Sequence, residues 1–250
     1  MSSAHDRPDL SDDQLRELLG LIQGADSVEL KLTVPDEDRR STVVALDLDP
    51  LDAYIRQVFF SDTPDLALNQ KGVVARARRT QGDPDDSVIK LRPVVPEELP
   101  DAVRSSKTFV VEVDAMPGGY VCSGAFKGET ADVREVVAGG RPTHKLFSKK
   151  QRAFFEQHAP DGIELDDLSI LGPVNVLKLK TSPQGFNRKL AVELWMYPDG
   201  SHILELSTRC KPDEAFQVAA EARAFLSGRC VNLSGKQETK TRAALEFFSG

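Results

Sequence analysis

Two short stretches of this chain alternate between charged and aliphatic residues, and no other feature constrains the fold as strongly. Arg76 and Arg78 alternate with alanines in the first stretch, and Lys90 and Arg92 alternate with aliphatic residues in the second. Successive side chains of a β-strand point to opposite faces, so each stretch predicts a strand with paired cations on one face. Turn-forming sequences rich in Asp, Pro and Gly separate these strands from each other and from a strand at Phe59.

Period-two patterns recur along most of the chain, and several carry carboxylates on the charged face. They predict further strands at residues 27–34, 41–48, 107–116, 121–127, 168–180, 190–197 and 202–209. Helical patterns predict a helix that ends near Gly24, a helical turn at 50–56, a partly helical insert near 129–168, and two helices at 212–227 and 236–248. Roughly eight to ten strands with few long helices predict a closed or nearly closed antiparallel barrel.

The charged faces of such a barrel can point outward to solvent or inward to a shared lumen. Outward charged faces would leave an apolar cavity suited to a lipid-like ligand. Inward faces would stack cations about 6 Å apart, and each pair would repel by roughly 3 kcal/mol at an effective dielectric constant of about 20. Interleaved carboxylates relieve part of this repulsion, and a bound polyanion would relieve the rest. The inward arrangement therefore indicates a polyphosphate held with a divalent metal, because Mg²⁺ and Mn²⁺ take carboxylate and phosphate oxygens.

The overall charge of the chain excludes a nucleic-acid-binding exterior. The formal net charge is −7 at pH 7, so a basic site must be local and enclosed. The three cysteines lack the spacing of a zinc site or a disulfide framework. The sequence has no apolar run of membrane-spanning length and no signal-peptide core, so we expect a cytoplasmic protein without a membrane partner. The sequence leaves the oligomeric state open.

An ordered set of short motifs carries a family resemblance over residues 27–245. The set consists of Glu29-Leu30-Lys31, Asp62-Thr63-Pro64-Asp65-Leu66-Ala67-Leu68, Arg76-Ala77-Arg78, Lys90-Leu91-Arg92-Pro93, Glu112-Val113-Asp114, Lys127-Gly128, Glu193, Ile203-Leu204-Glu205-Leu206 and a late basic helix at 236–245. Each motif is weak alone, but the ordered set is specific. Through this ordered set of motifs, the chain resembles the CYTH superfamily, the triphosphate tunnel metalloenzymes.

The resemblance implies a fold of the α+β class, mainly β: a closed eight-stranded antiparallel β-barrel, or tunnel, with a charged lumen and flanking helices. Within residues 1–24, the sequence itself predicts a leader at 1–10 followed by a short covering helix. Residues 25–250 would form a single CYTH-like tunnel domain with the helical insert near 129–168. Members of the family bind triphosphate-containing small molecules; they hydrolyse inorganic, thiamine or nucleoside triphosphates, and a few cyclise ATP.

The resemblance also assigns roles to residues, position by position. The phosphate-binding residues would be Lys31, Arg76, Arg78, Lys90, Arg92, Lys127, Lys178, Lys180 and Lys240. The ligands of Mg²⁺ or Mn²⁺ would be Glu29, Glu112, Asp114, Glu193 and Glu205. Glu29 and Lys31 would be the catalytic residues.

The chain departs from the family pattern at three positions. Ser27 and Ser207 stand where the family commonly has carboxylates, and Phe60 stands where it often has tyrosine. The expected function is metal-dependent hydrolysis of a triphosphate-containing substrate, and cyclisation of ATP is the less favoured activity. The alternative is a non-catalytic triphosphate- or polyphosphate-binding module of the same fold that has lost its acidic metal ligands.

Overall fold

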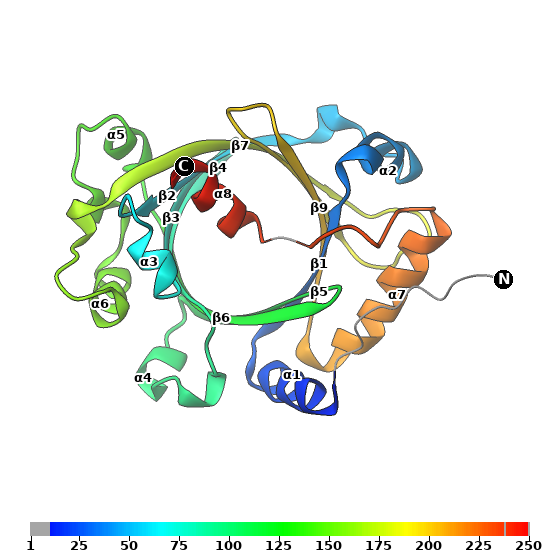
Figure 1. Cartoon of the computed structure of the whole chain (residues 1–250), viewed down its shortest axis with the longest axis horizontal. Helices are drawn as coiled ribbons and strands as arrows, with labels where there is room; N and C mark the ends of the chain where they lie inside the picture. The colour runs from blue at the N-terminus through cyan, green and yellow to red at the C-terminus, as the bar shows by residue number, and fades with distance from the viewer. Residues whose placement is uncertain (1–10, 238, 250) are drawn as a thin grey trace.

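Nine β-strands close into a ring over residues 11–237 and 239–249, the part of the chain that the computed structural model describes (Figure 1). In chain order they are β1 (Ser27–Val34), β2 (Tyr54–Asp62), β3 (Val73–Thr80), β4 (Asp83–Leu91), β5 (Phe109–Met116), β6 (Gly119–Glu129), β7 (Ser169–Thr181), β8 (Leu190–Met196) and β9 (His202–Cys210). Around the ring the order is β1-β5-β6-β4-β3-β2-β7-β8-β9, and β9 pairs with β1. The α+β, mainly β class and the closed barrel are confirmed.

The strand directions correct the prediction of eight antiparallel strands. Neighbouring strands run antiparallel apart from β1 and β5, which run parallel with Glu29 opposite Asp114. Strictly alternating directions close into a ring only when the strand number is even, so the nine strands of the described chain require a parallel pair. The prediction is wrong in number and direction because a period-two pattern identifies a strand but not its neighbours.

The predicted strand at 41–48 is also wrong. Its first part lies in helix α2 (Arg39–Ala45), and a turn follows. Its β-branched residues favour a strand, but Val44 is 79% exposed and takes no part in the core, so burial does not reinforce that preference. The acidic turn at Asp36–Asp38 instead stabilises a helix N-terminus through the helix dipole.

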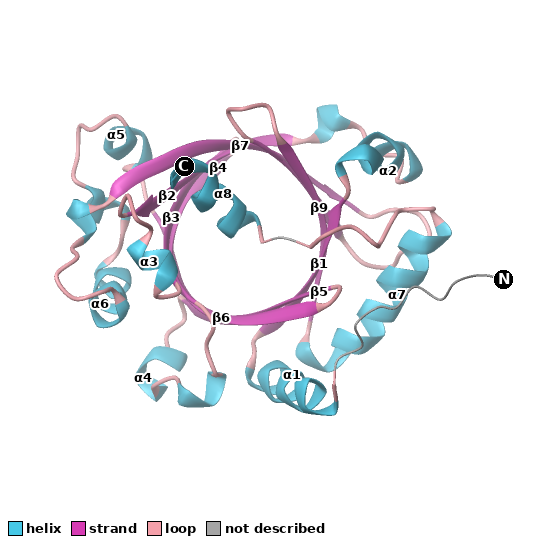
Figure 2. Ribbon diagram, in the orientation of Figure 1, coloured by secondary structure: helices cyan, strands magenta, loops and turns pink. Residues whose placement is uncertain are grey.

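Helices α1, α2, α4, α5, α6 and α7 lie outside the ring (Figure 2). The helices other than α2 are α1 (Asp12–Gly24), α3 (Ala67–Gln70), α4 (Asp101–Arg104), α5 (Val133–Val137), α6 (Lys149–His158), α7 (Ala215–Gly228) and α8 (Lys240–Ser249). Short 3₁₀ helices cover Asp36–Asp38, Pro50–Asp52, Pro96–Glu98, Thr143–Leu146, Leu165–Asp167 and Pro212–Glu214. None of the described helices combines the length and apolar character needed to cross a membrane.

The outward faces of the strands form the main hydrophobic core with the surrounding helices. Val28, Ile89 and Val111 belong to one buried cluster with Leu18 of α1 and Phe155 of α6. The expected covering helix is α1, and the expected leader at 1–10 lies outside the described residues. Aliphatic groups on these strand faces therefore point away from the lumen, which leaves their charged neighbours facing inward.

The insert near 129–168 is fixed to the barrel by a buried amide of α6. The side chain of Gln151 is 1% exposed and donates to the backbone oxygens of Ser87 in β4 at 2.9 Å and Phe126 in β6 at 3.3 Å. The same side chain completes a capping box with Ser148 at the start of α6. These hydrogen bonds offset the cost of burying the amide and orient α6 on two strands.

Helix α8 lies within the outline of the ring instead of around it (Figure 1). Ala244 and Leu245 of α8 are buried in a second cluster with Val58, Phe60 and Val176, which belong to the barrel strands. Fully burying a leucine side chain contributes about 1.5 to 3 kcal/mol, so this contact stabilises the position of α8. The expectation that the lumen is charged and aliphatic groups point away from it therefore holds for only part of the barrel. One end is apolar and is filled by α8.

Candidate functional site

A cavity of about 290 Å³ lies in the lumen and is lined mainly by charged side chains. The basic residues of the lining are Lys31, Arg56, Arg76, Arg78, Lys90, Arg92, Lys127, Lys178, Arg209 and Lys240, and the acidic ones are Glu29, Glu112, Asp114, Glu193 and Glu205. Within the described chain this is ten cations against five carboxylates, an excess of five positive charges. The cavity therefore attracts anions although the chain as a whole carries a net charge of −7.

The lining brings together the predicted metal ligands and most of the predicted phosphate-binding residues. The exception is Lys180, which is exposed near the end of β7 and lies outside the lining. Lys178, two residues earlier on the same strand, lines the cavity. The sequence predicts that Lys178 and Lys180 share a strand face, but Lys180 does not reach the site because it lies closer to the end of the strand.

Sequence reasoning missed two arginines of the lining, Arg56 and Arg209. Arg56 falls in the predicted helical turn at 50–56, but the 3₁₀ helix covers only Pro50–Asp52 and Arg56 already belongs to β2. Arg209 continues the period-two series of β9 that begins at Glu205. Extending that alternation by one further step would have found it.

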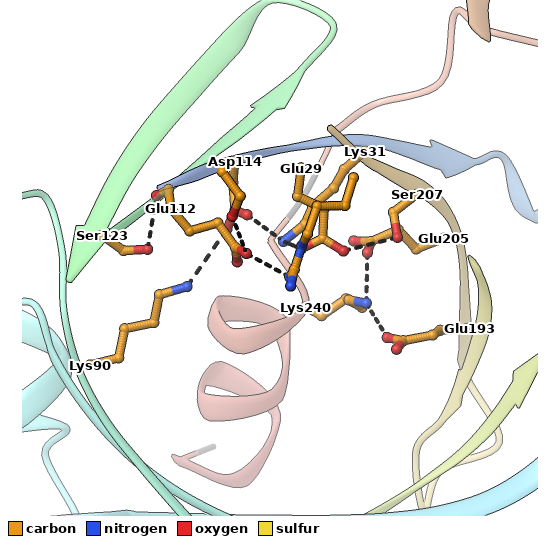
Figure 3. Close-up of polar contacts among 12 residues, drawn as sticks. Glu29, Lys31, Lys90, Glu112, Asp114, Ser123, Glu193, Glu205, Ser207 and Lys240 are labelled. Carbon is orange, nitrogen blue, oxygen red and sulfur yellow. Dashed lines mark hydrogen bonds and ion pairs between the residues drawn. The ribbon is translucent and has the colours of Figure 1, made fainter. Parts of the chain in front are cut away.

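Three carboxylates from the parallel pair β1 and β5 meet on one wall of the cavity (Figure 3). Glu29, Glu112 and Asp114 each offer an oxygen, and these oxygens lie within 4.8 Å of one another. The Nζ atom of Lys31 lies 2.8 Å from Asp114 and 3.4 Å from Glu29, and the Nζ atom of Lys90 lies 3.7 Å from Asp114. We call Glu29, Glu112 and Asp114 the carboxylate triad.

The lysines keep Asp114 of the triad ionised. Burial alone would raise the pKa of Asp114, but Lys31 and Lys90 outweigh burial and lower the pKa to about 2. Burial would lower the pKa of Lys31, but Asp114 and Glu29 raise it above its ordinary value. Ionised carboxylate oxygens at this spacing suit a hard divalent cation, so these residues fit Mg²⁺ or Mn²⁺.

The two remaining carboxylates, Glu193 and Glu205, lie outside the triad and pair with other lysines (Figure 3). Glu193 accepts hydrogen bonds from Lys178 at 2.6 Å and from the indole of Trp195 at 3.1 Å, and it also pairs with Lys240. Lys240, the first residue of α8, lies 2.6 Å from Glu205 as well. Burial opposes ionisation of Glu193, but Lys240 and Lys178 hold its pKa well below the ordinary value. The structure therefore separates the five predicted metal ligands into two groups.

Three cations of the lining have no ion pair with a described residue: Arg76, Arg92 and Lys127. The Nε atom of Arg76 is shielded from solvent and has no hydrogen-bond partner in the described part of the chain. Burial and the neighbouring Arg78 lower the pKa of Arg76 to about 9. The cavity thus holds a guanidinium whose charge is poorly compensated by the protein itself.

Serine hydroxyls stand beside the triad at the positions where the family resemblance expects further carboxylates. Ser27 donates to Glu112 at 3.3 Å, and Ser207 donates to Glu29 at 3.0 Å. Each hydroxyl stabilises an ionised carboxylate without adding a negative charge. The two departures from the family pattern therefore lie in direct contact with the triad.

Lys90 is expected to make anion binding depend on pH. Burial lowers the pKa of Lys90 to about 8, while Asp114 raises it and Lys31 lowers it further. An anion binds the charged form, so binding takes up a proton near this pH, and affinity falls once Lys90 is neutral. We expect tripolyphosphate to bind about tenfold more weakly at pH 9 than at pH 7 through this group, as measured by isothermal titration calorimetry.

The Lys90→Arg variant is the control for this prediction, because its guanidinium stays charged throughout the range. Dividing the affinity of the wild type by that of the variant at each pH cancels the titration of the ligand. The ratio should fall as pH rises. A ratio that does not change between pH 7 and 9 would contradict the role of Lys90.

Comparison with known proteins identifies the fold. Neither a protein-family model nor a curated protein matches the sequence. Among solved structures, the candidate adenylyl cyclase HpAC1 from Hippeastrum, which has a dominant triphosphatase activity, matches with a TM-score of 0.61 and 14% identity over 88% of this chain and 95% of its own. A candidate adenylate cyclase from Bacillus halodurans matches with a TM-score of 0.58 and 11% identity over 87% of this chain and 98% of its own. These similarities establish the fold, and the chain has the CYTH, or triphosphate tunnel, fold that its motifs predict.

Proposed function

We propose that this protein is a metal-dependent hydrolase of a triphosphate-containing small molecule. The observation that carries the proposal is the set of cavity cations that have no ion pair with a described residue, above all Arg76. Charges removed from water without a partner are costly, and phosphate oxygens would supply the missing charge and hydrogen bonds. The triphosphatase activity of HpAC1, which shares the fold, supports this choice of anion.

The proposal assigns separate tasks to the two sides of the cavity. Arg76, Arg78, Lys90, Arg92 and Lys127, together with Lys31, Lys178 and Lys240, would bind phosphate oxygens. The triad would hold Mg²⁺ or Mn²⁺. When bound, the metal would neutralise phosphate oxygens and lower the pKa of a water molecule in contact with it.

The proposed reaction is an in-line displacement by water. The water oxygen forms a bond to the terminal phosphorus, the bond from that phosphorus to the bridging oxygen breaks, and orthophosphate leaves together with the shortened phosphate and one proton. Glu29 would orient the water and accept its proton. Lys31 and Arg76 would stabilise the negative charge that spreads over the phosphate oxygens in the transition state.

The test is incubation of the purified protein with tripolyphosphate and either Mg²⁺ or Mn²⁺. We expect release of orthophosphate that stops with a metal chelator and in the Asp114→Asn variant. ATP in place of tripolyphosphate, with products separated by chromatography, shows whether a nucleotide is hydrolysed or cyclised. Absence of both tripolyphosphate binding and phosphate release would refute the proposal.

A non-catalytic phosphate-binding module is the second candidate, and the contacts of Ser27 and Ser207 favour it. Each serine replaces a carboxylate expected from the resemblance, so the triad has fewer negative neighbours with which to hold metal. Tight tripolyphosphate binding without phosphate release would support this candidate. Turnover regained in the Ser27→Glu, Ser207→Glu double variant would then identify the two serines as the cause.

A further inference from the structure

The side chain of Arg209 contacts the carboxylate triad from the β9 side of the cavity. Its Nη2 atom lies 2.5 Å from Glu112 and 3.5 Å from Glu29. Arg209 stands directly opposite Glu29 in the pairing of β9 with β1, so the strand register fixes this contact. A guanidinium bound to two carboxylates of the triad competes with any other cation for the same oxygens.

The triad is therefore neutralised by the protein itself. Its three carboxylates face Lys31, Lys90 and Arg209, which are its ion-pair partners in the described part of the chain. The side chains of Lys31 and Lys90 are 17% and 19% exposed, whereas that of Arg209 is 53% exposed. Arg209 is the partner that can move into solvent at the lowest cost of desolvation and packing.

Resting on the function proposed above, we infer that Arg209 is a displaceable counter-cation that a divalent metal must remove from Glu112 and Glu29 before it can bind the triad. Arg209 then lowers the affinity of the free protein for metal. A polyphosphate that enters the cavity offers Arg209 new oxygens and so favours its departure from the triad. Metal and phosphate binding are thereby coupled through one side chain.

The test is a titration of the phosphate-free protein with Mn²⁺, with free Mn²⁺ followed by electron paramagnetic resonance. We expect Arg209→Gln to bind Mn²⁺ about tenfold more tightly than the wild type, because the competing charge is gone. Arg209→Lys keeps a charge but lacks the planar fork that spans two carboxylates, so its affinity should lie between the two. Circular dichroism checks that each variant is folded.

Arg141→Gln is the matched control. Arg141 is also about half exposed and also pairs with two carboxylates, Asp132 and Glu135, but it lies outside the cavity lining. Its removal should leave Mn²⁺ affinity unchanged. An Arg209→Gln variant that binds Mn²⁺ no more tightly than the wild type would overturn the inference, as would absence of Mn²⁺ binding in both. Tripolyphosphate binding, measured separately without metal, shows whether the proposed function fails as well.

Discussion

Replacing Arg76 by methionine is expected to weaken tripolyphosphate binding by about 100-fold, since one or two charge-assisted hydrogen bonds are lost. The same change is expected to leave the free protein at least as stable as the wild type. The pKa of Arg76 is lowered to about 9, which means that the folded cavity disfavours its charge. Methionine fills similar space without a charge, so a gain in unfolding free energy on the order of 1 kcal/mol is expected. Calorimetric titration and urea denaturation measure the two effects.

Arg79→Met is the control on the same strand. Arg79 directly follows Arg78, pairs with Asp85 at 3.4 Å and has a side chain that is 42% exposed. It is not among the residues that line the cavity. This variant should bind tripolyphosphate like the wild type. If Arg76→Met kept its affinity, or if it lost several kcal/mol of stability without ligand, Arg76 would be a structural residue.

The second large effect is expected from Glu193→Gln. Glu193 is 9% exposed and lies between Lys178, Lys240 and, at 3.6 Å, Arg56. Removing this buried partner leaves Lys178 and Arg56 uncompensated and leaves Lys240 with Glu205, and such changes cost about 3 to 5 kcal/mol. Urea denaturation of the free protein should show this loss. Tripolyphosphate should restore more stability to the variant than to the wild type, because the anion replaces the missing negative charge.

Asp13→Asn is the comparison for a surface ion pair. Asp13 pairs with Arg16 at 2.7 Å on α1, and both side chains are largely exposed. Its removal should cost less than about 1 kcal/mol. Mn²⁺ titration adds a second readout, since Glu193→Gln should retain metal binding whereas Asp114→Asn should lose it. Loss of Mn²⁺ binding in Glu193→Gln would place a metal at Glu193 after all.

Alternation along single strands was enough to predict most of the cavity lining. It placed Arg76 with Arg78 and Lys90 with Arg92 on common faces, because the side-chain period of a strand is a local property. The same rule overlooked Arg56, since the preceding proline and aspartates favoured a turn that ends earlier than expected. It also gave no way to see that Lys180 lies too near the end of β7 to reach the lumen.

Relations between strands could not be predicted in this way. The separation of the triad from Glu193 and Glu205 depends on which strands are neighbours, and the parallel pairing of β1 with β5 joins segments about eighty residues apart. The position of α8 depends likewise on long-range packing, because Leu245 shares a buried cluster with Val58 and Phe60, which lie far from it in the sequence. Local patterns carry no information on such contacts.

The position of α8 inside the barrel has a consequence for the substrates that the proposed hydrolase could accept. Buried side chains of α8 and of the barrel strands pack together at one end of the barrel, so under the proposed function a linear phosphate polymer would not thread from one side to the other. Such a polymer would enter end first, and the released orthophosphate would leave by the route that the substrate used. A long polymer would therefore be shortened from its tip, and its interior linkages would stay out of reach.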